Sequence, residues 1–246
     1  MDKVAVISGF YGPDQNITFK GQRNKNYPSF FVTNNLKAAK KAENVGWNIC
    51  FDDDAPVSDD KYISTMQGKK PKAVPSELID LSEFDYTLWV DDKIKISDSM
   101  LINREIPRLK KNQNKASLRT HWKGSTKTVW KELALSLEQP RYKEFFFKYV
   151  DYINQKVSDG YSDQGTMTAC GVILRNNKDP QVKKIFEEWF EEITRSGLAN
   201  DQVTFFFIRQ KYKIEISEML FPLNYTQLYT QKLIDFKNYL VKKHFY

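Results

Sequence analysis

The chain has 246 residues, of which 41% are hydrophobic and 28% charged, and its formal net charge is +7. No apolar run approaches the ~20 residues of a membrane-spanning helix, and the N-terminal residues are atypical of a signal peptide, so we expect a cytoplasmic protein without a transmembrane segment. The length suits a single domain over residues 1–246, and the positive charge favours an anionic partner, such as a phosphorylated small molecule or nucleic acid.

Short apolar strands alternate with helical segments in the first part of the chain. The expected strands cover residues 4–7, 30–32, 47–51 and 86–90. The expected helical segments between them cover 36–43 and about 59–79, the second interrupted by Pro71 and Pro75. This alternation predicts an α/β fold with a mostly parallel central sheet flanked by helices, in which ligands bind at the carboxyl ends of the strands.

The second part of the chain is less regular. We expect helices over about 128–137, 141–157 and 180–194, and a strand over 171–175. Asp201 and Gln202 open a further apolar helix, and residues of about 225–246 predict a final helix.

Two carboxylates, Asp91 and Asp92, stand where the apolar strand 86–90 reaches the surface. Carboxylates in this position can hold Mn²⁺ or Mg²⁺ against a diphosphate, because hard cations prefer oxygen ligands. A solvated turn after the strand is the alternative. Asp201 also has two interpretations. It is either a functional carboxylate or the N-cap of the apolar helix that follows, because aspartate is a good N-cap.

Several motifs recur in the order found in a known family. The run Trp-Val-Asp-Asp-Lys-Ile at 89–94 is similar to a Trp-Ile-Asp-Gly-Lys-Leu motif, and the basic run at 69–75 is similar to an Arg-x-x-Lys-x-x-Pro segment. Residues 171–175 match a Gly-Val-Ile-x-Arg strand, and Asp201 and Gln202 follow later. In this order the chain resembles GT-A type nucleotide-sugar glycosyltransferases, and more narrowly the glycosyltransferase-like domain family of plant mucilage-related proteins and their bacterial and viral relatives.

The resemblance implies a GT-A-like Rossmann-type fold and a hexosyltransferase-like activity. The implied partners are a nucleotide-sugar donor, in particular a UDP-sugar, and a glycan, glycoprotein or glycolipid acceptor, whereas nucleic acid is not expected. The implied catalytic residues are Asp201 and Gln202. The implied donor-binding residues are Lys69, Lys72, Asp91, Asp92, Lys93, Arg119 and His121. We also expect a loop over residues 8–12 after the first strand, in which Ser8, Phe10 and Tyr11 contact the nucleoside and an aromatic ring stacks on its base.

The chain departs from the common Asp-x-Asp metal motif, because its third position is Lys93. A protonated lysine cannot ligate a cation, so either Asp91 and Asp92 hold the divalent ion with other ligands, or Lys93 itself neutralises the diphosphate as a point charge. Two other functions remain open. Asp91, Asp92 and Lys93 also fit the acidic and lysine element of a metal-dependent nucleic-acid enzyme, and a glycan-binding protein of the same fold could lack transfer activity.

Overall fold

The computed structural model describes residues 2–19, 26–94, 101–111, 118–123 and 126–214. Within them a six-stranded sheet has the order β3-β2-β1-β4-β6-β5. The strands are β1 (Val4–Phe10), β2 (Ser29–Thr33), β3 (Asn48–Phe51), β4 (Tyr86–Val90), β5 (Leu118–Lys123) and β6 (Met167–Asn176). β1 is parallel to β2 and β4, and β2 to β3, whereas β6 is antiparallel to both of its neighbours. The expected mostly parallel sheet is therefore confirmed.

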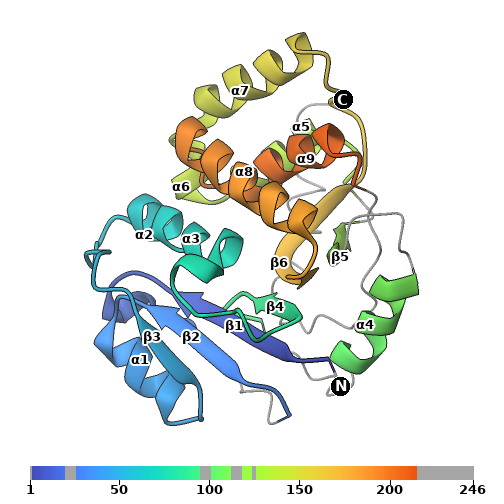
Figure 1. Cartoon of the computed structure of the whole chain (residues 1–246). Helices are drawn as coiled ribbons and strands as arrows, with labels where there is room; N and C mark the ends of the chain where they lie inside the picture. The colour runs from blue at the N-terminus through green and yellow to red at the C-terminus, as the bar shows by residue number, and fades with distance from the viewer. Residues whose placement is uncertain (1, 20–25, 95–100, 112–117, 124–125, 215–246) are drawn as a thin grey trace.

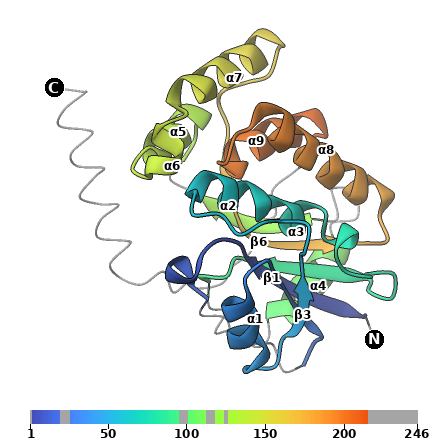
Figure 2. The same cartoon turned by 90° about the vertical axis from the view of Figure 1, so that its left-hand side faces the viewer.

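Helices cover both faces of this sheet (Figure 1). One face carries α1 (Leu36–Glu43) and α4 (Leu101–Lys111), and the other carries α2 (Lys61–Gln67), α3 (Lys69–Ala73), α8 (Pro180–Ser196) and α9 (Asp201–Lys211). Figure 2 shows the sheet between these two layers. An outer group packs against α9 and consists of α5 (Val129–Ser136), α6 (Pro140–Lys143) and α7 (Phe146–Ser158). Short 3-10 turns lie at Asp14–Asn16 and Pro75–Glu77.

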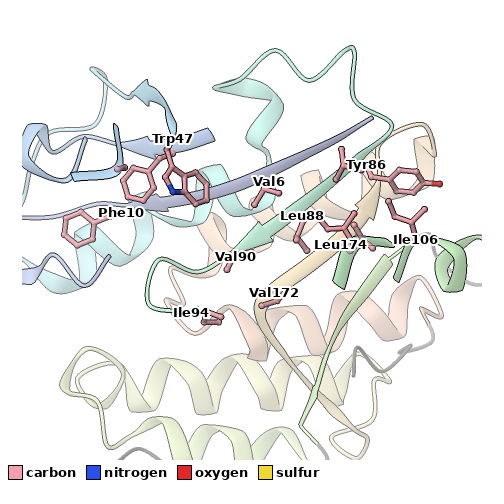
Figure 3. Packing of buried hydrophobic residues seen from close by; sticks show 14 of the residues in the cluster. Val6, Phe10, Trp47, Tyr86, Leu88, Val90, Ile94, Ile106, Val172 and Leu174 are labelled. Carbon is pink, nitrogen blue, oxygen red and sulfur yellow. The ribbon is translucent and has the colours of Figure 1, made fainter. Parts of the chain in front are cut away.

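Successive residues of the strands supply separate hydrophobic cores on the two faces of the sheet, because side chains alternate along a strand. Leu88 and Val172 pack on the face of α1 and α4, with Phe10 and Trp47 in the same cluster (Figure 3). Trp89, the neighbour of Leu88, points to the opposite face and joins a cluster of α8 and α9 side chains. The face that buries Trp89 also carries α3 with Lys69 and Lys72, and α9 with Asp201.

Several sequence-based boundaries change in the structure. The single helix expected over 141–157 is divided into α6 and α7, since Glu144 and Phe145 separate them. Ser8 and Phe10, expected in a loop, belong to β1, while α4 and β5 were not predicted. The helix expected over 225–246 lies outside the described residues. No helix in the described part of the chain has the length and apolar character that spanning a membrane requires.

Candidate functional site

The direction in which strands are added to the sheet reverses at β1. β2 and β3 lie on one side of β1, and β4 lies on the other. In open α/β sheets, ligands bind in the crevice outside the carboxyl ends of the strands at such a reversal. Tyr11 follows β1 here, and Asp91 and Asp92 follow β4. Thr18 approaches from the segment after β1, and its Oγ1 donates to Asp92 Oδ2 at 2.5 Å.

Two lysines of α3 meet one carboxylate of α9 beside this crevice. Asp201 Oδ2 accepts from Lys69 Nζ at 3.0 Å and from Lys72 Nζ at 2.8 Å. The three side chains are only 9%, 7% and 8% exposed for Lys69, Lys72 and Asp201 respectively. Lys69 and Lys72 lie three positions apart, which places them on the same face of a helix. The ordered contact therefore depends on α9 packing against α3.

Asp91 completes the cluster from the end of β4. Its Oδ1 atom lies 3.0 Å from Lys72 Nζ and accepts from Trp89 Nε1 at 2.7 Å, while its backbone N donates to the carbonyl of Gly171 at 2.8 Å. The side chain of Asp91 is 21% exposed, more than the other three charged groups. We call Lys69, Lys72, Asp91 and Asp201 the charge quartet. It contains two cations and two anions, and Asp91 is its most accessible member.

The charges of the quartet set the pKa values of its members. Burial opposes ionisation of Asp201, but Lys69 and Lys72 outweigh it and hold the pKa of Asp201 well below its usual value. Burial likewise opposes the charged form of Lys72, yet Asp201 and Asp91 together raise its pKa. For Lys69, burial and the neighbouring Lys72 outweigh the attraction of Asp201, and the pKa is lowered. Burial raises the pKa of Asp92, which lies beside the quartet.

Arg175 of β6 binds the backbone of α3 next to the quartet. Its guanidinium donates to the carbonyl oxygens of Lys72 at 2.7 Å and Ala73 at 2.9 Å, and it lies 4.4 Å from the centre of the Phe186 ring. The side chain is buried, and burial lowers its pKa to about 9. The sequence motif of residues 171–175 includes Arg175 but indicates no role for it. A lone arginine that ends an apolar strand was the available signal, because such a charge needs buried partners.

Gly171 allows Asp91 its position. A Cβ at residue 171 would lie 2.7 Å from Ile94 Cδ1 and 3.2 Å from Asp91 Oδ2. Any larger residue would therefore push the side chains of Ile94 and Asp91 out of their positions. These two residues belong to a turn in which Ile94 N donates to the carbonyl of Asp91 at 2.8 Å. Lys93 lies at the tip of this turn and is exposed.

Ser8, Phe10 and Tyr11, at the end of β1, were expected to contact the nucleoside, but only Tyr11 lies on the face of the sheet that carries the quartet. Ser8 is buried within β1, and Phe10 belongs to the core on the opposite face of the sheet, so neither lies in a loop that could close over a nucleoside. Tyr11 does lie on the quartet's face, but it is buried and its hydroxyl donates to Asp52 Oδ2 at 2.6 Å. Burial and Asp52 raise the pKa of Tyr11 well above its usual value.

Arg119 and His121 both lie on β5, next to β6 and away from β4 in the strand order. The backbone register shifts between Thr120 and His121, where a bulge interrupts the pairing with β6. Their side chains are outside the described part of the structure, and their assignment to the donor stays a prediction.

Asp201 is the first residue of α9 and does not cap it. The N-cap is Asn200, whose side chain accepts from the backbone N of Gln202 at 3.1 Å. The capping interpretation of Asp201 is therefore wrong, and its carboxylate is used for the two lysines instead. Gln202 is half-buried beside it, and its Oε1 atom has no hydrogen-bond partner among the described residues.

Both carboxylates that were expected to bind a divalent cation already have partners. Asp91 contacts Lys72 and Trp89, and Asp92 accepts a hydrogen bond from Thr18. In the described part of the chain, no group of three or more His, Cys, Asp and Glu side chains is arranged to hold a metal ion.

Comparison with known proteins agrees with this architecture at the level of the fold. The crystal structure of mouse xyloside xylosyltransferase 1 in its apo form superimposes with a TM-score of 0.50 and 11% identity, covering 89% of this chain and 85% of that one. The chain has a GT-A-like fold. The Mn/GDP form of core-mannan synthase A from Aspergillus fumigatus gives a TM-score of 0.45 at 11% identity, over 85% of this chain and 70% of that one.

No protein-family model matches the chain, and no curated protein matches it in sequence. The narrower resemblance to the plant mucilage-related family thus rests on the motifs alone. At 11% identity the likeness to xyloside xylosyltransferase concerns the fold, so donor and acceptor have to be argued from the site.

Proposed function

We propose that the protein is a glycosyltransferase that transfers a sugar, a hexose in particular, from a nucleotide-sugar donor to a glycan or other acceptor. The observation that carries this proposal is the charge quartet at the carboxyl ends of β1 and β4. Two lysines and two carboxylates from three distant segments converge there, beside the strand reversal where an α/β sheet binds its ligand. The GT-A-like fold supports the assignment.

Glycosyl transfer uses both positively and negatively charged groups of the enzyme. The leaving group is a nucleoside diphosphate, whose negative charge grows as the anomeric bond breaks, and cations held in place beforehand stabilise it most effectively. Lys93 is exposed at the tip of the turn after β4, next to Asp91 and Asp92, where it can meet a diphosphate that enters from solvent. UDP-sugars are the first donors to test, as the family resemblance implies.

The two carboxylates of the quartet are suited to bind the hydroxyl groups of the donor sugar. Asp91 is the most accessible of the four groups, and ionised carboxylates accept hydrogen bonds from sugar hydroxyls. Asp201 is held ionised and next to Gln202, whose Oε1 is without a partner within the described residues. A buried acceptor without a partner calls for an explanation, and a donor-sugar hydroxyl would supply the missing hydrogen bond.

The deciding experiment is a thermal-shift screen of UDP-, GDP-, CMP- and ADP-sugars, followed by product analysis of donor hydrolysis without acceptor. A ligand that binds the native state alone raises the melting temperature by mass action. We expect at least one nucleotide sugar to stabilise the protein and to be hydrolysed slowly. Stabilisation without hydrolysis would indicate a catalytically inactive binding protein, and the absence of any shift would refute the proposal.

A further inference from the structure

We infer that Lys72 occupies the place of a divalent cation in this site, and that the protein binds the nucleoside diphosphate of its donor without a metal ion. The inference rests on the proposed function and adds to it the way in which the site's carboxylates are neutralised. Its experiment separates a failure of this inference from a failure of the function itself.

The contacts of Lys72 are those expected of a bridging cation. The Nζ atom lies 3.0 Å from Asp91 Oδ1 and 2.8 Å from Asp201 Oδ2, so one ammonium joins the carboxylates of two distant segments. It also lies 5.8 Å from the centre of the Trp89 ring, over which a cation is attracted. The side chain is 7% exposed, and the carbonyl of the same residue accepts from Arg175, which holds this part of α3 in place.

The donor set around Lys72 does not fit a magnesium or manganese ion. Mg²⁺ needs octahedral coordination, with about six oxygen ligands. Asp91 Oδ1 is shared between Lys72 and Trp89, and Asp92 Oδ2 is taken by Thr18. The next residue, where a second metal-binding aspartate is common, is Lys93. A divalent ion bound to Asp91 would lie close to the ammonium of Lys72 and to that of Lys93, and charge repulsion from both opposes its binding.

The charge balance of the quartet explains how a diphosphate is accepted without a metal. Bare carboxylates at a strand end repel a phosphate, and a bound cation normally removes this repulsion. Here Lys69 and Lys72 offset Asp91 and Asp201, so the quartet has no net formal charge. The exposed Lys93 then adds a positive charge at the entrance. We therefore assign the diphosphate contact to Lys93 and the neutralisation of Asp91 to Lys72.

Calorimetric titration of UDP and GDP tests this assignment, with the protein dialysed against EDTA and, in parallel, supplied with Mn²⁺. We expect the dissociation constants with chelator and with manganese to agree within about threefold. A larger gain of affinity with manganese would overturn the inference and leave the proposed function standing. Binding of neither nucleotide in either buffer, together with no response to any nucleotide sugar, would refute the function and the inference together.

Two substitutions sharpen the test. Lys93→Met should weaken diphosphate binding by about tenfold or more in EDTA, whereas Lys41→Met, which changes an exposed lysine of α1 on the other face, should leave it unchanged. Lys72→Met leaves Asp91 and Asp201 without their shared ammonium, so we expect Mn²⁺ to raise the melting temperature of this variant and not that of the unchanged protein. A manganese-dependent rise in the unchanged protein that Asp91→Asn abolishes would show a metal site at Asp91 and disprove the inference. If Lys72→Met does not fold, the titrations of the unchanged protein with EDTA and with Mn²⁺ decide alone.

Discussion

Lys72 Nζ lies 2.8 Å from Asp201 Oδ2, although 129 positions separate the two residues in the chain. The contact forms only when the start of α9 packs against α3, and both elements lie on the same face of the sheet. Removing one partner from a buried ion pair leaves an uncompensated charge, which costs far more than the net strength of the pair. Substitutions in this site therefore act on stability and on turnover together, so both quantities have to be measured on every variant.

Asp91→Asn should abolish turnover of the nucleotide sugar and leave the protein folded. An amide oxygen can still accept from Trp89 Nε1, and Lys72 keeps Asp201 as its counter-ion, so we expect a loss of about 1 to 3 kcal/mol in the free energy of unfolding. Turnover should fall by about a hundredfold or more, because the carboxylate charge is lost from the reacting centre. Asp53→Asn, at an exposed carboxylate after β3, is the matched control and should change neither quantity. Normal turnover in Asp91→Asn would exclude Asp91 from the site.

Arg175→Met should weaken nucleoside diphosphate binding although Arg175 contacts no accessible part of the site. The change removes two hydrogen bonds to the carbonyls of Lys72 and Ala73, which orient α3, and we expect a loss of about 2 to 4 kcal/mol in stability. Arg175→Lys should restore the positive charge but not the pair of hydrogen bonds that the planar guanidinium donates.

The readout that separates positioning from mere stability is the ratio of the UDP dissociation constants at a temperature where both variants are fully folded. A positioning role predicts weaker UDP binding in both variants relative to the unchanged protein. Arg195→Met, at an exposed arginine of α8, serves as the control. Unchanged UDP affinity in a folded Arg175→Met protein would show that Arg175 is purely structural.

The strongest local patterns predicted the fold well. The helix of α1 and the strand of β4 begin and end at the residues expected, because apolar runs and helix-forming residues decide them locally. α4 was not predicted, since Pro107 lies inside it and an interior proline argues against a helix. β5 was not predicted either, because its residues carry no alternation strong enough to identify a strand, and pairing with β6 defines it.

The site was predictable as a set of residue types but not as a set of partners. Lys69, Lys72, Asp91 and Asp201 were each candidates, yet their mutual pairing depends on how α3, β4 and α9 pack, which no local pattern encodes. The cap of α9 illustrates the same limit. Asn200 and Asp201 are both good caps, and only the backbone geometry shows that Asn200 is used.

The acid sensitivity of the fold should depend on Asp201. Its pKa is lowered in the folded state, so the folded protein holds this carboxylate ionised at pH values where the unfolded chain, with a pKa of about 3.9, takes up a proton. The stability that Asp201 contributes is therefore fully present above pH ~4 and is lost progressively as the pH falls further. Melting temperatures should drop steeply below that pH, and less steeply in Asp201→Asn. Asp54→Asn, at an exposed carboxylate, should reproduce the steep fall, and an equally steep fall in Asp201→Asn would contradict this account.

Asp201 should also serve the transfer step, and a double substitution can show this independently of its role as a counter-ion. Asp201→Asn alone leaves Lys69 and Lys72 with only Asp91, and breaking such a buried pair costs about 3 to 5 kcal/mol. Adding Lys69→Met restores the balance of one lysine and one carboxylate, so stability should recover in part. Turnover should not recover, because an amide supplies neither a base nor a full negative charge.

The control for the start of α9 is Asn200→Ala, which removes the cap and the hydrogen bond from Asn200 Nδ2 to Ser136 Oγ, 2.6 Å long. It should cost about 1 to 2 kcal/mol of stability, comparable with the loss that remains in the double variant, while keeping most of the turnover. Turnover and melting temperature are therefore measured on the same preparations of these variants, of Lys69→Met alone and of the unchanged protein. If the double variant regains turnover along with stability, Asp201 acts only as a counter-ion to the lysines. If turnover stays low while stability returns, and Lys69→Met alone keeps its turnover, the carboxylate acts in the reaction, since Asn200→Ala shows what loss of stability at this position does by itself.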